Sequence, residues 1–333
     1  MMKAHVAVLD TGYDAYEQER EILGGAGFEV RVFAGGRDDR RGKASFASGA
    51  EGVLLRWTKV DDDFLDRLPQ VRAMVRYGVG YDNVDVGSCT RHGVRVANVR
   101  GYANDSVSDH ALALMLACAR NLREGMRRLR ETYGGPPRRA NLDFHDKTLG
   151  IVGLGNIGGA LCVKAQGLFA RVAAADPYVE AARFETLGAE RVELAELLGR
   201  SDVVSLHCNL TEETRGLIDG AAFGRMLRGP ILVNTARGEV VDRAALVEAL
   251  REGRIHSAGV DVFAEEPPGA EWDELLAHPH VVATGHYAWH SVSASRELQR
   301  RAAANLAAML RGETPPDCLN PWCESRRGGE EAG

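Results

Sequence analysis

The sequence has few of the features that mark metal-binding, secreted, membrane or nucleic-acid-binding proteins. It holds six cysteines in 333 residues, and none has the short spacing of metal ligands. No apolar run is long enough for a signal peptide or a membrane span. The formal net charge of -6 leaves no overall basic field to hold nucleic acid or an anionic membrane. We therefore expect a soluble cytoplasmic protein with reduced thiols, no metal and a small-molecule ligand.

What the sequence does have is a regular alternation of short apolar runs with helical patterns. Runs such as His5 to Leu9 and Ile231 to Asn234 alternate with amphipathic stretches along the chain. This alternation predicts an α/β fold of two doubly wound parallel-sheet domains. Asn104 to Arg130 is expected to form one long helix, and the helix expected at Val292 to Leu310 should return to the first domain. Two polar stretches, a loop from Tyr133 and a disordered tail from about Glu324, complete this prediction.

One glycine-rich stretch has the pattern of a dinucleotide-binding turn. The apolar run at 149–152 ends in Gly153, Gly155 and Gly158, and a helical pattern follows. Gly153 is expected to permit the tight turn, and Gly155 to let the backbone approach a pyrophosphate. Gly158 should let the helix pack closely on the strand. A structural turn that binds nothing is the alternative.

The residues around this turn predict which dinucleotide would bind. The backbone N–H groups of Asn156 and Ile157 would point at the phosphates from the positively polarised start of a helix. Asp176 ends the next apolar run, at the distance where an acid contacts the adenosine ribose. Its carboxylate can accept hydrogen bonds from both ribose hydroxyls and would repel a 2′-phosphate. NAD is therefore favoured over NADP.

A second set of polar residues follows the later apolar runs, where ligands of such sheets bind. Arg237 offers a fixed fork for a carboxylate or for a carbonyl oxygen that becomes anionic. His286 can donate a proton near neutral pH, and Glu266 beside it would favour the protonated ring. Together they suit reduction of a carbonyl by NADH. Each residue also has a purely structural interpretation. Arg237 could form a surface salt bridge, Glu266 could be a loop carboxylate, and His286 could be a hydrogen-bonded histidine in an interdomain turn.

Several long motifs, in the same order, resemble the NAD-dependent D-isomer-specific 2-hydroxyacid dehydrogenases over nearly the whole chain. The resemblance implies that Arg237 clamps the substrate carboxylate or carbonyl, that His286 is the acid/base, and that Glu266 is its partner. The matching stretches are RYGVGYDNVD at 76–85, NDSVSDHALALMLACAR at 104–120, VGLGNIGG at 152–159, SLHCNLTEETRGLID at 205–219, LVNTARGEVVD at 232–242, GVDVFAEEPP at 259–268 and TGHYAWHS at 284–291.

The same resemblance implies further contacts with the cofactor and the substrate. Asp261 would contact the nicotinamide carboxamide, and backbone amides around Tyr77 to Gly80 would hold the substrate carboxylate. The remaining implied cofactor residues are Asn209, Thr214, Thr235 and Ala236. The implied substrate loop is made of Tyr77, Gly78, Val79 and Gly80.

The family fold places a Rossmann NAD-binding domain, 104–289, inside a flavodoxin-like substrate-binding domain made of 1–103 and 290–333. Homodimers are usual in this family. Within it, HYAWHS resembles the C-terminal-binding-protein-like and hydroxypyruvate reductase subgroup. Trp289 would line the substrate pocket or pack in a dimer contact. Arg56 would hold a second anionic group of the substrate or pair with a surface acid.

Two other functions fit parts of this pattern. An NAD(H)-gated binding or co-regulator protein would need the nucleotide site but not a proton donor, so an intact set of Arg237, Glu266 and His286 favours the enzyme. Oxidation of formate or phosphite would also deliver hydride to NAD. Neither the physiological 2-hydroxy acid nor the preferred direction can be inferred from these motifs.

Overall fold

The computed structural model describes residues 4–131 and 139–324, which form two compact units. Unit 1 is Met1–Tyr102 with Ser291–Gly333, and unit 2 is Ala103–His290. These boundaries lie one residue from those predicted from the sequence. The first part of the loop predicted from Tyr133 and nearly all of the tail predicted from Glu324 lie outside the described residues.

Unit 1 is built on a five-stranded parallel sheet in the order β2-β1-β3-β4-β5. This is the flavodoxin-like order. All four residues of β1 and of β3 are buried, as strands covered on both faces require. The elements are β1 His5–Val8, α1 Glu17–Gly25, β2 Glu29–Val32, α2 Arg40–Phe46, β3 Gly52–Leu55, α3 Asp62–Leu65, β4 Ala73–Arg76, α4 Val86–Arg91, β5 Arg95–Ala97 and α13 Val292–Leu310.

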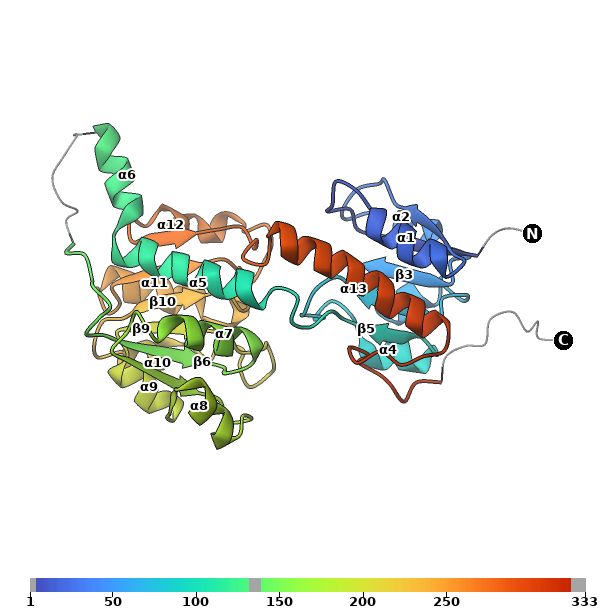
Figure 1. Ribbon diagram of the computed structural model, residues 1–333. Helices are drawn as coiled ribbons and strands as arrows, with labels where there is room; N and C mark the ends of the chain where they lie inside the picture. The colour runs from blue at the N-terminus through green and yellow to red at the C-terminus, as the bar shows by residue number, and fades with distance from the viewer. Residues whose placement is uncertain (1–3, 132–138, 325–333) are drawn as a thin grey trace. The chain divides into compact units, whose positions relative to one another are not determined.

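Helix α13 completes unit 1, as the sequence predicted, although it comes from the far end of the chain. It packs beside α1 on one face of the sheet (Figure 1). A Cβ at Gly52 of β3 would lie 3.1 Å from methyl carbons of Leu306 and Leu310, so the helix approaches the strand closely. Among the described residues no helix, including the 19-residue α13, is long and apolar enough to cross a membrane.

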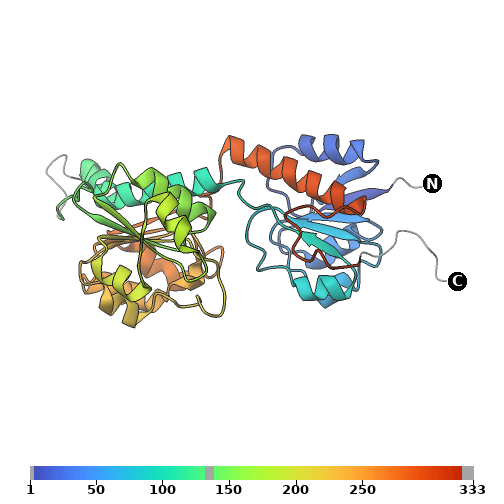
Figure 2. The same ribbon diagram turned by 60° about the horizontal axis from the view of Figure 1, so that its bottom comes forward.

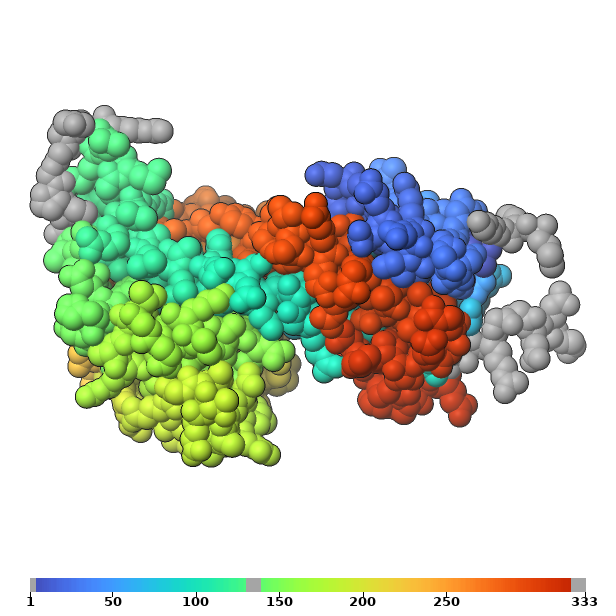
Figure 3. Space-filling model, in the orientation of Figure 1, coloured from blue at the N-terminus to red at the C-terminus, as the bar shows by residue number. Residues whose placement is uncertain are grey.

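The segment after α13, dark red in Figure 3, is joined to the edge of the unit 1 sheet. Cys318 forms an antiparallel bridge with Ala97 of β5. The amide of the fully buried Asn320 accepts from Val96 N (2.8 Å) and donates to Val94 O (3.0 Å). These bonds satisfy backbone groups of the edge strand that would otherwise be open to another chain.

Unit 2 is built on a seven-stranded parallel sheet in the order β12-β11-β10-β9-β6-β7-β8. The strand order reverses between β6 and β9, which is the position where doubly wound sheets bind ligands. The elements are α5 Asn104–Ala119, α6 Leu122–Glu131, β6 Thr148–Val152, α7 Asn156–Ala165, β7 Arg171–Ala175, α8 Ala181–Leu187, β8 Glu190–Arg191, α9 Leu194–Arg200, β9 Val203–Leu206, α10 Gly220–Arg225, β10 Ile231–Asn234, η1 Gly238–Val240, α11 Arg243–Arg251, β11 Ser257–Val260, η2 Ala270–Trp272, α12 Asp273–Ala277 and β12 Val281–Ala283.

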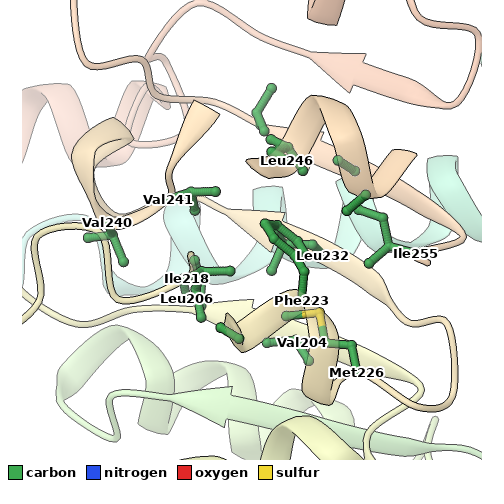
Figure 4. Packing of buried hydrophobic residues seen from close by; sticks show 14 of the residues in the cluster. Val204, Leu206, Ile218, Phe223, Met226, Leu232, Val240, Val241, Leu246 and Ile255 are labelled. Atoms are coloured by element: carbon green, nitrogen blue, oxygen red, sulfur yellow. The ribbon is translucent and has the colours of Figure 1, made fainter. Parts of the chain in front are cut away.

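Helices cover both faces of the unit 2 sheet (Figure 2), and a hydrophobic core lies between the helices and the sheet on each face. One joins α5, α7 and α8 to the sheet. The other joins α9, α10, α11 and α12 to the opposite face and includes Val204, Phe223 and Leu232 (Figure 4). The predicted fold of two doubly wound parallel-sheet domains is therefore confirmed.

The single helix predicted over Asn104 to Arg130 is wrong, because the structure has two helices there. α5 ends at Ala119 and α6 begins at Leu122. Asn121 between them has a left-handed backbone (φ 50°) and its side chain donates to Asn141 Oδ1 (3.0 Å). Leu142 N donates to Ala119 O (2.9 Å) as well, so contacts with a segment twenty residues later end the first helix.

Phe223 gives a direct test of this packing. Its side chain is 1% exposed and lies in the core beside Met226 (Figure 4). Phe223→Ala should lower the free energy of unfolding by about 3–5 kcal/mol, because it removes buried surface and leaves a cavity. Urea denaturation followed by circular dichroism measures the change. Leu227→Ala, at a side chain 82% exposed, is the control and should stay within about 0.5 kcal/mol of the parent. Equal effects of the two substitutions would contradict the packing described.

Candidate active site

The glycine-rich turn lies after β6, at the point where the strand order of unit 2 reverses. Gly153 has a φ of 92°, and a Cβ there would lie 2.7 Å from Cys208 N of the loop after β9. A Cβ at Gly158 would lie 2.0 Å from Gly153 O, so the helix packs against the turn itself. Apart from its chain neighbours, no atom of the described residues lies within 4 Å of a Cβ built at Gly155. The turn therefore leaves open space at its middle glycine, as the approach of a pyrophosphate needs.

Asp176, directly after β7, is joined to the same turn. Its Oδ2 accepts from Leu154 N (2.8 Å), and its Oδ1 accepts from Tyr178 N (3.0 Å). Each oxygen of a carboxylate has a further lone pair, so both can still accept from a ligand hydroxyl. Asn156 and Ile157 begin α7 beside it, where backbone N–H groups have no partner within the helix.

Two more segments meet this edge with the residues that a dinucleotide would need. Thr235, after β10, has a buried Oγ1 without a hydrogen-bond partner among the residues that the structure describes, and the residue is 9% exposed. The next residue, Ala236, donates its N–H to Asn234 Oδ1 (3.0 Å). In the loop after β9, Thr214 Oγ1 donates to Asn209 O (2.6 Å). An open glycine, an acid whose oxygens can still accept hydrogen bonds and an unsatisfied hydroxyl together fit a bound dinucleotide.

Arg237 is the first charged residue after β10. Asn234 Nδ2 donates to its carbonyl (2.8 Å), and its own Nη1 donates to Ala236 O (2.8 Å). The following residue, Gly238, touches the backbone of the neighbouring loop, because a Cβ there would lie 2.1 Å from Phe263 C. This backbone contact brings the loop of Arg237 against the loop that carries Glu266.

Glu266 and His286 form an ion pair, with 2.7 Å between Glu266 Oε2 and His286 Nδ1. Burial alone would raise the pKa of Glu266, but the hydrogen bond from His286 and the charges of His286 and Arg237 lower it below its usual value. Because Nδ1 is bonded to the carboxylate, Nε2 of His286 is the nitrogen left to exchange a proton with a ligand. The structure thus brings the three predicted catalytic side chains to one edge of one sheet.

His286 lies in a turn held by the buried Asp261. The backbone of His286 is left-handed (φ 55°), a conformation that costs free energy for any residue except glycine. Asp261 accepts from Tyr287 N (3.1 Å) and Ala288 N (3.0 Å), and its carbonyl accepts from His286 N (2.7 Å). Trp289 Nε1 donates to the carbonyl of His286 (3.1 Å). Residues after the histidine therefore support its conformation.

His207, which also follows a strand, is a different kind of histidine. It lies half-buried directly after β9, and its Nε2 lies 2.8 Å from Ser205 Oγ. Desolvation lowers the pKa of His207 to about 4, well below its usual value, which disfavours the protonated ring. Within residues 4–131 and 139–324, no group of three His, Cys, Asp or Glu side chains is arranged to hold a metal ion.

In unit 1, the loop after β4 presents backbone amides. Gly78 O accepts from Val99 N (2.9 Å), and Val79 O accepts from Asn98 Nδ2 (2.6 Å). Both carbonyls are therefore already hydrogen-bonded within the protein. In the described part of the chain, the N–H groups of Gly78, Val79 and Gly80 have no partner. Successive N–H groups of this kind form a nest that binds anions.

Tyr77 corrects the predicted substrate loop. Its N–H donates to Leu55 O (2.8 Å) on the neighbouring strand, and its hydroxyl donates to Glu19 Oε1 (2.7 Å) in the interior. Neither donor is left for a ligand, so the predicted carboxylate site narrows to Gly78–Gly80. The sequence analysis also missed Arg76 at the end of β4, whose Nη1 donates to Tyr77 O (2.7 Å) beside this loop. The sequence does contain a sign of Arg76, because it is a charged residue at the end of an otherwise buried strand.

Arg56, at the end of β3, lies against aromatic rings. Its guanidinium carbon is 5.9 Å from the ring centre of Tyr13 and 5.4 Å from that of Trp57. Its backbone N–H donates to Asp10 Oδ2 (2.7 Å), which also accepts from the N–H groups of Trp57 and Thr58. The buried Asp10 carboxylate therefore fixes the backbone on which Arg56 is mounted.

Comparison with known proteins agrees with this geometry. Residues 112–288 match the family model described as D-isomer specific 2-hydroxyacid dehydrogenase, NAD binding domain. The chain is 40% identical over 272 residues to a glyoxylate reductase of Korarchaeum cryptofilum, covering 80% of this chain and 82% of that protein. The chain belongs to the D-isomer specific 2-hydroxyacid dehydrogenase family.

Other family members differ in length or are known as structures. A D-3-phosphoglycerate dehydrogenase of Mycobacterium leprae is 38% identical to this chain. The match covers 88% of this chain but only 55% of the longer relative. The solved structure of the TT0316 protein from Thermus thermophilus has a TM-score of 0.85 and 33% identity, covering 95% of this chain and 99% of that one. The apo D-lactate dehydrogenase of Escherichia coli has a TM-score of 0.81 and 31% identity, with the same coverage.

Family membership confirms the resemblance found in the sequence. This dehydrogenase is an NAD-dependent oxidoreductase that transfers a hydride between NAD(H) and a 2-oxo acid/D-2-hydroxy acid pair. Unit 2 contains the NAD-binding domain.

Proposed function

We propose that the dehydrogenase reduces a small 2-oxo acid with NADH, using His286 as acid/base, Glu266 as its partner and Arg237 as the charge clamp. The 2.7 Å pair between His286 Nδ1 and Glu266 Oε2, beside Arg237, is the observation that carries this proposal. In this pair the carboxylate of Glu266 binds Nδ1 of His286, so Nε2 is the ring nitrogen that would face the substrate. Glu266 thereby holds the ring of His286 with its other nitrogen, Nε2, available as the proton donor.

The chain's own residues account for the charge and the proton in this reaction. Bound NADH supplies the hydride to C2 of the 2-oxo acid. Arg237 stabilises negative charge as it develops on the carbonyl oxygen, and its fixed fork can also bind the carboxylate. His286 Nε2 donates the proton to that oxygen, while Glu266 neutralises the positive charge on the ring until that transfer. The reverse steps oxidise a D-2-hydroxy acid.

Unit 1 would supply recognition of the substrate. The free N–H groups of Gly78, Val79 and Gly80 support binding of the substrate carboxylate by the backbone. Arg56, fixed by Asp10 and mounted on Tyr13 and Trp57, supports a preference for a substrate with a second anionic group. Trp289 would line the substrate pocket and favour a substrate with an apolar or extended side chain.

The residues near the glycine turn support NAD rather than NADP. Asp176 would bind the ribose hydroxyls and repel a 2′-phosphate, and Gly153, Gly155, Asn156, Ile157 and Gly158 would hold the pyrophosphate. Thr235, with its unsatisfied hydroxyl, and its neighbour Ala236 would face the cofactor, as would the Asn209–Thr214 loop. Asp261 keeps one lone pair on Oδ2 for the nicotinamide carboxamide.

A homodimer is the expected assembly. Three apolar side chains on α6 are exposed at positions that share one helix face: Leu122 (51%), Met126 (71%) and Leu129 (60%). A second copy of the chain would bury them, and sedimentation would measure its presence. The six free cysteines, four of them buried, fit a reducing compartment, which supports the cytoplasm as the site of action.

Loss of NADH absorbance on addition of 2-oxo acids tests the proposal. The panel runs from glyoxylate and pyruvate through hydroxypyruvate to branched, aromatic and phosphorylated acids, with NADPH as the control. We expect rapid turnover of one substrate class with NADH and poor turnover with NADPH. Tight NADH binding without turnover of any acid, in either direction, would contradict the proposed reaction and favour a nucleotide-gated binding protein.

A further inference from the structure

Two polar side chains outside the proposed catalytic set are joined in a chain of hydrogen bonds. His110 Nε2, from α5, lies 2.9 Å from Thr284 Oγ1, directly after β12. Thr284 Oγ1 donates to Asp261 Oδ1 at 2.6 Å. A hydroxyl has one proton, so the proton of Thr284 is used toward Asp261. His110 must therefore carry its proton on Nε2 and donate it to Thr284.

This chain ends at the residue that holds the turn of His286. Asp261 has two backbone donors on that turn, the N–H groups of Tyr287 and Ala288, and the hydroxyl of Thr284 is the third donor to its carboxylate. Thr284 fixes the orientation of Oδ1, and Oδ1 in turn fixes Tyr287. Because His286 has a left-handed backbone, its position depends on such external bonds.

The surroundings make these bonds strong. The side chain of Asp261 is 1% exposed and that of His110 is 17% exposed. The ring of His110 also packs edge-on against Tyr287, with 5.3 Å between the ring centres. Hydrogen bonds in such a shielded place are stronger than in water, and a lost partner leaves a buried polar group unsatisfied.

We propose that His110 and Thr284 are positioning residues of the catalytic histidine. They act through Asp261 and the backbone of residues 286–288, and they need no contact with the reacting atoms. The proposal rests on the proposed function of His286 as the acid/base. It predicts loss of kcat when the chain of hydrogen bonds is broken, with substrate KM preserved.

Matched substitutions test each bond. Thr284→Val removes the hydroxyl at constant shape, whereas Thr284→Ser keeps it. His110→Phe removes the N–H donor, whereas His110→Gln can replace it. Thr284→Val and His110→Phe should each lower kcat by about 10- to 100-fold, because a small misplacement of a catalytic group has an effect of this size. Thr284→Ser and His110→Gln should restore most of kcat. Wild-type kcat in both Thr284→Val and His110→Phe would overturn the proposal.

A double-mutant cycle separates positioning from general structural damage. In a His286→Asn background, Thr284→Val should have no further effect on the residual rate, because the group that it positions is gone. The same fold-loss in that background as in the wild type would overturn the proposal. Fluorescence titration of NADH and the midpoint of thermal unfolding accompany each variant. Full turnover by His286→Asn alone would instead refute the proposed function of His286, and this outcome is separate from the first.

Discussion

His286→Asn is expected to abolish most turnover while NADH still binds. Asparagine keeps a polar side chain of similar length but cannot donate a proton from a cationic ring. Loss of general acid catalysis lowers kcat by about 10²- to 10⁴-fold. The dissociation constant for NADH should stay within about 2-fold, because no residue of the glycine turn is changed. Stopped-flow or steady-state loss of NADH absorbance gives kcat, and fluorescence titration gives the affinity.

His145→Asn is the matched control for this experiment. His145 is an exposed histidine before β6, outside the edge of the sheet where Arg237 and Glu266 lie. Its substitution should leave kcat unchanged. If His286→Asn lost NADH binding together with turnover, the histidine would belong to the cofactor site and the assignment as acid/base would be wrong.

Arg237→Gln should have the second large effect. Glutamine can donate one hydrogen bond but brings no positive charge to the developing oxyanion. Removal of a group that stabilises such charge lowers turnover by about 10²- to 10³-fold. Arg237→Lys restores the charge without the planar fork, so it should recover only part of kcat/KM. Both kcat and KM should be measured with the best 2-oxo acid of the panel.

Arg251→Gln provides a control of the same chemistry on α11. Arg251 is an exposed arginine that pairs with Glu274 at the surface. Its loss should leave kcat/KM unchanged, since surface ion pairs contribute little. Equal kcat/KM for Arg237→Gln and the parent protein would show that the clamp lies elsewhere, and Arg76 would then be the first residue to test.

The parts of the fold that depend on local chemistry could be predicted from the sequence. Continuous apolar runs imply strands covered on both faces. Gly153 has a positive φ, and glycine is the residue that adopts this conformation most readily, so the tight turn could be predicted from the residue type. Helix α5 was expected to continue because the apolar spacing continues past residue 119. It ends there because Asn121 bonds with Asn141, a contact that no local pattern contains.

The same distinction applies to the site. Arg237, Glu266 and His286 each follow a predicted strand, so the topology alone placed them at one edge. Tyr77 was assigned to the substrate loop because the motif includes it, but its N–H pairs with Leu55 on the neighbouring strand. His110 was missed for a similar reason, since its partner Thr284 is 174 residues away in the chain.

The amide nest of Gly78–Gly80 has a consequence for the divergence of enzymes of this kind. Backbone N–H groups do not depend on the side chain, so most substitutions in this loop would leave the proposed carboxylate site unchanged. In the proposed substrate site, side chains such as Arg56 and Trp289 could then be exchanged for a new substrate side chain while the backbone still binds the carboxylate. A substrate-switching library should therefore vary these two positions and leave the loop of glycines unchanged.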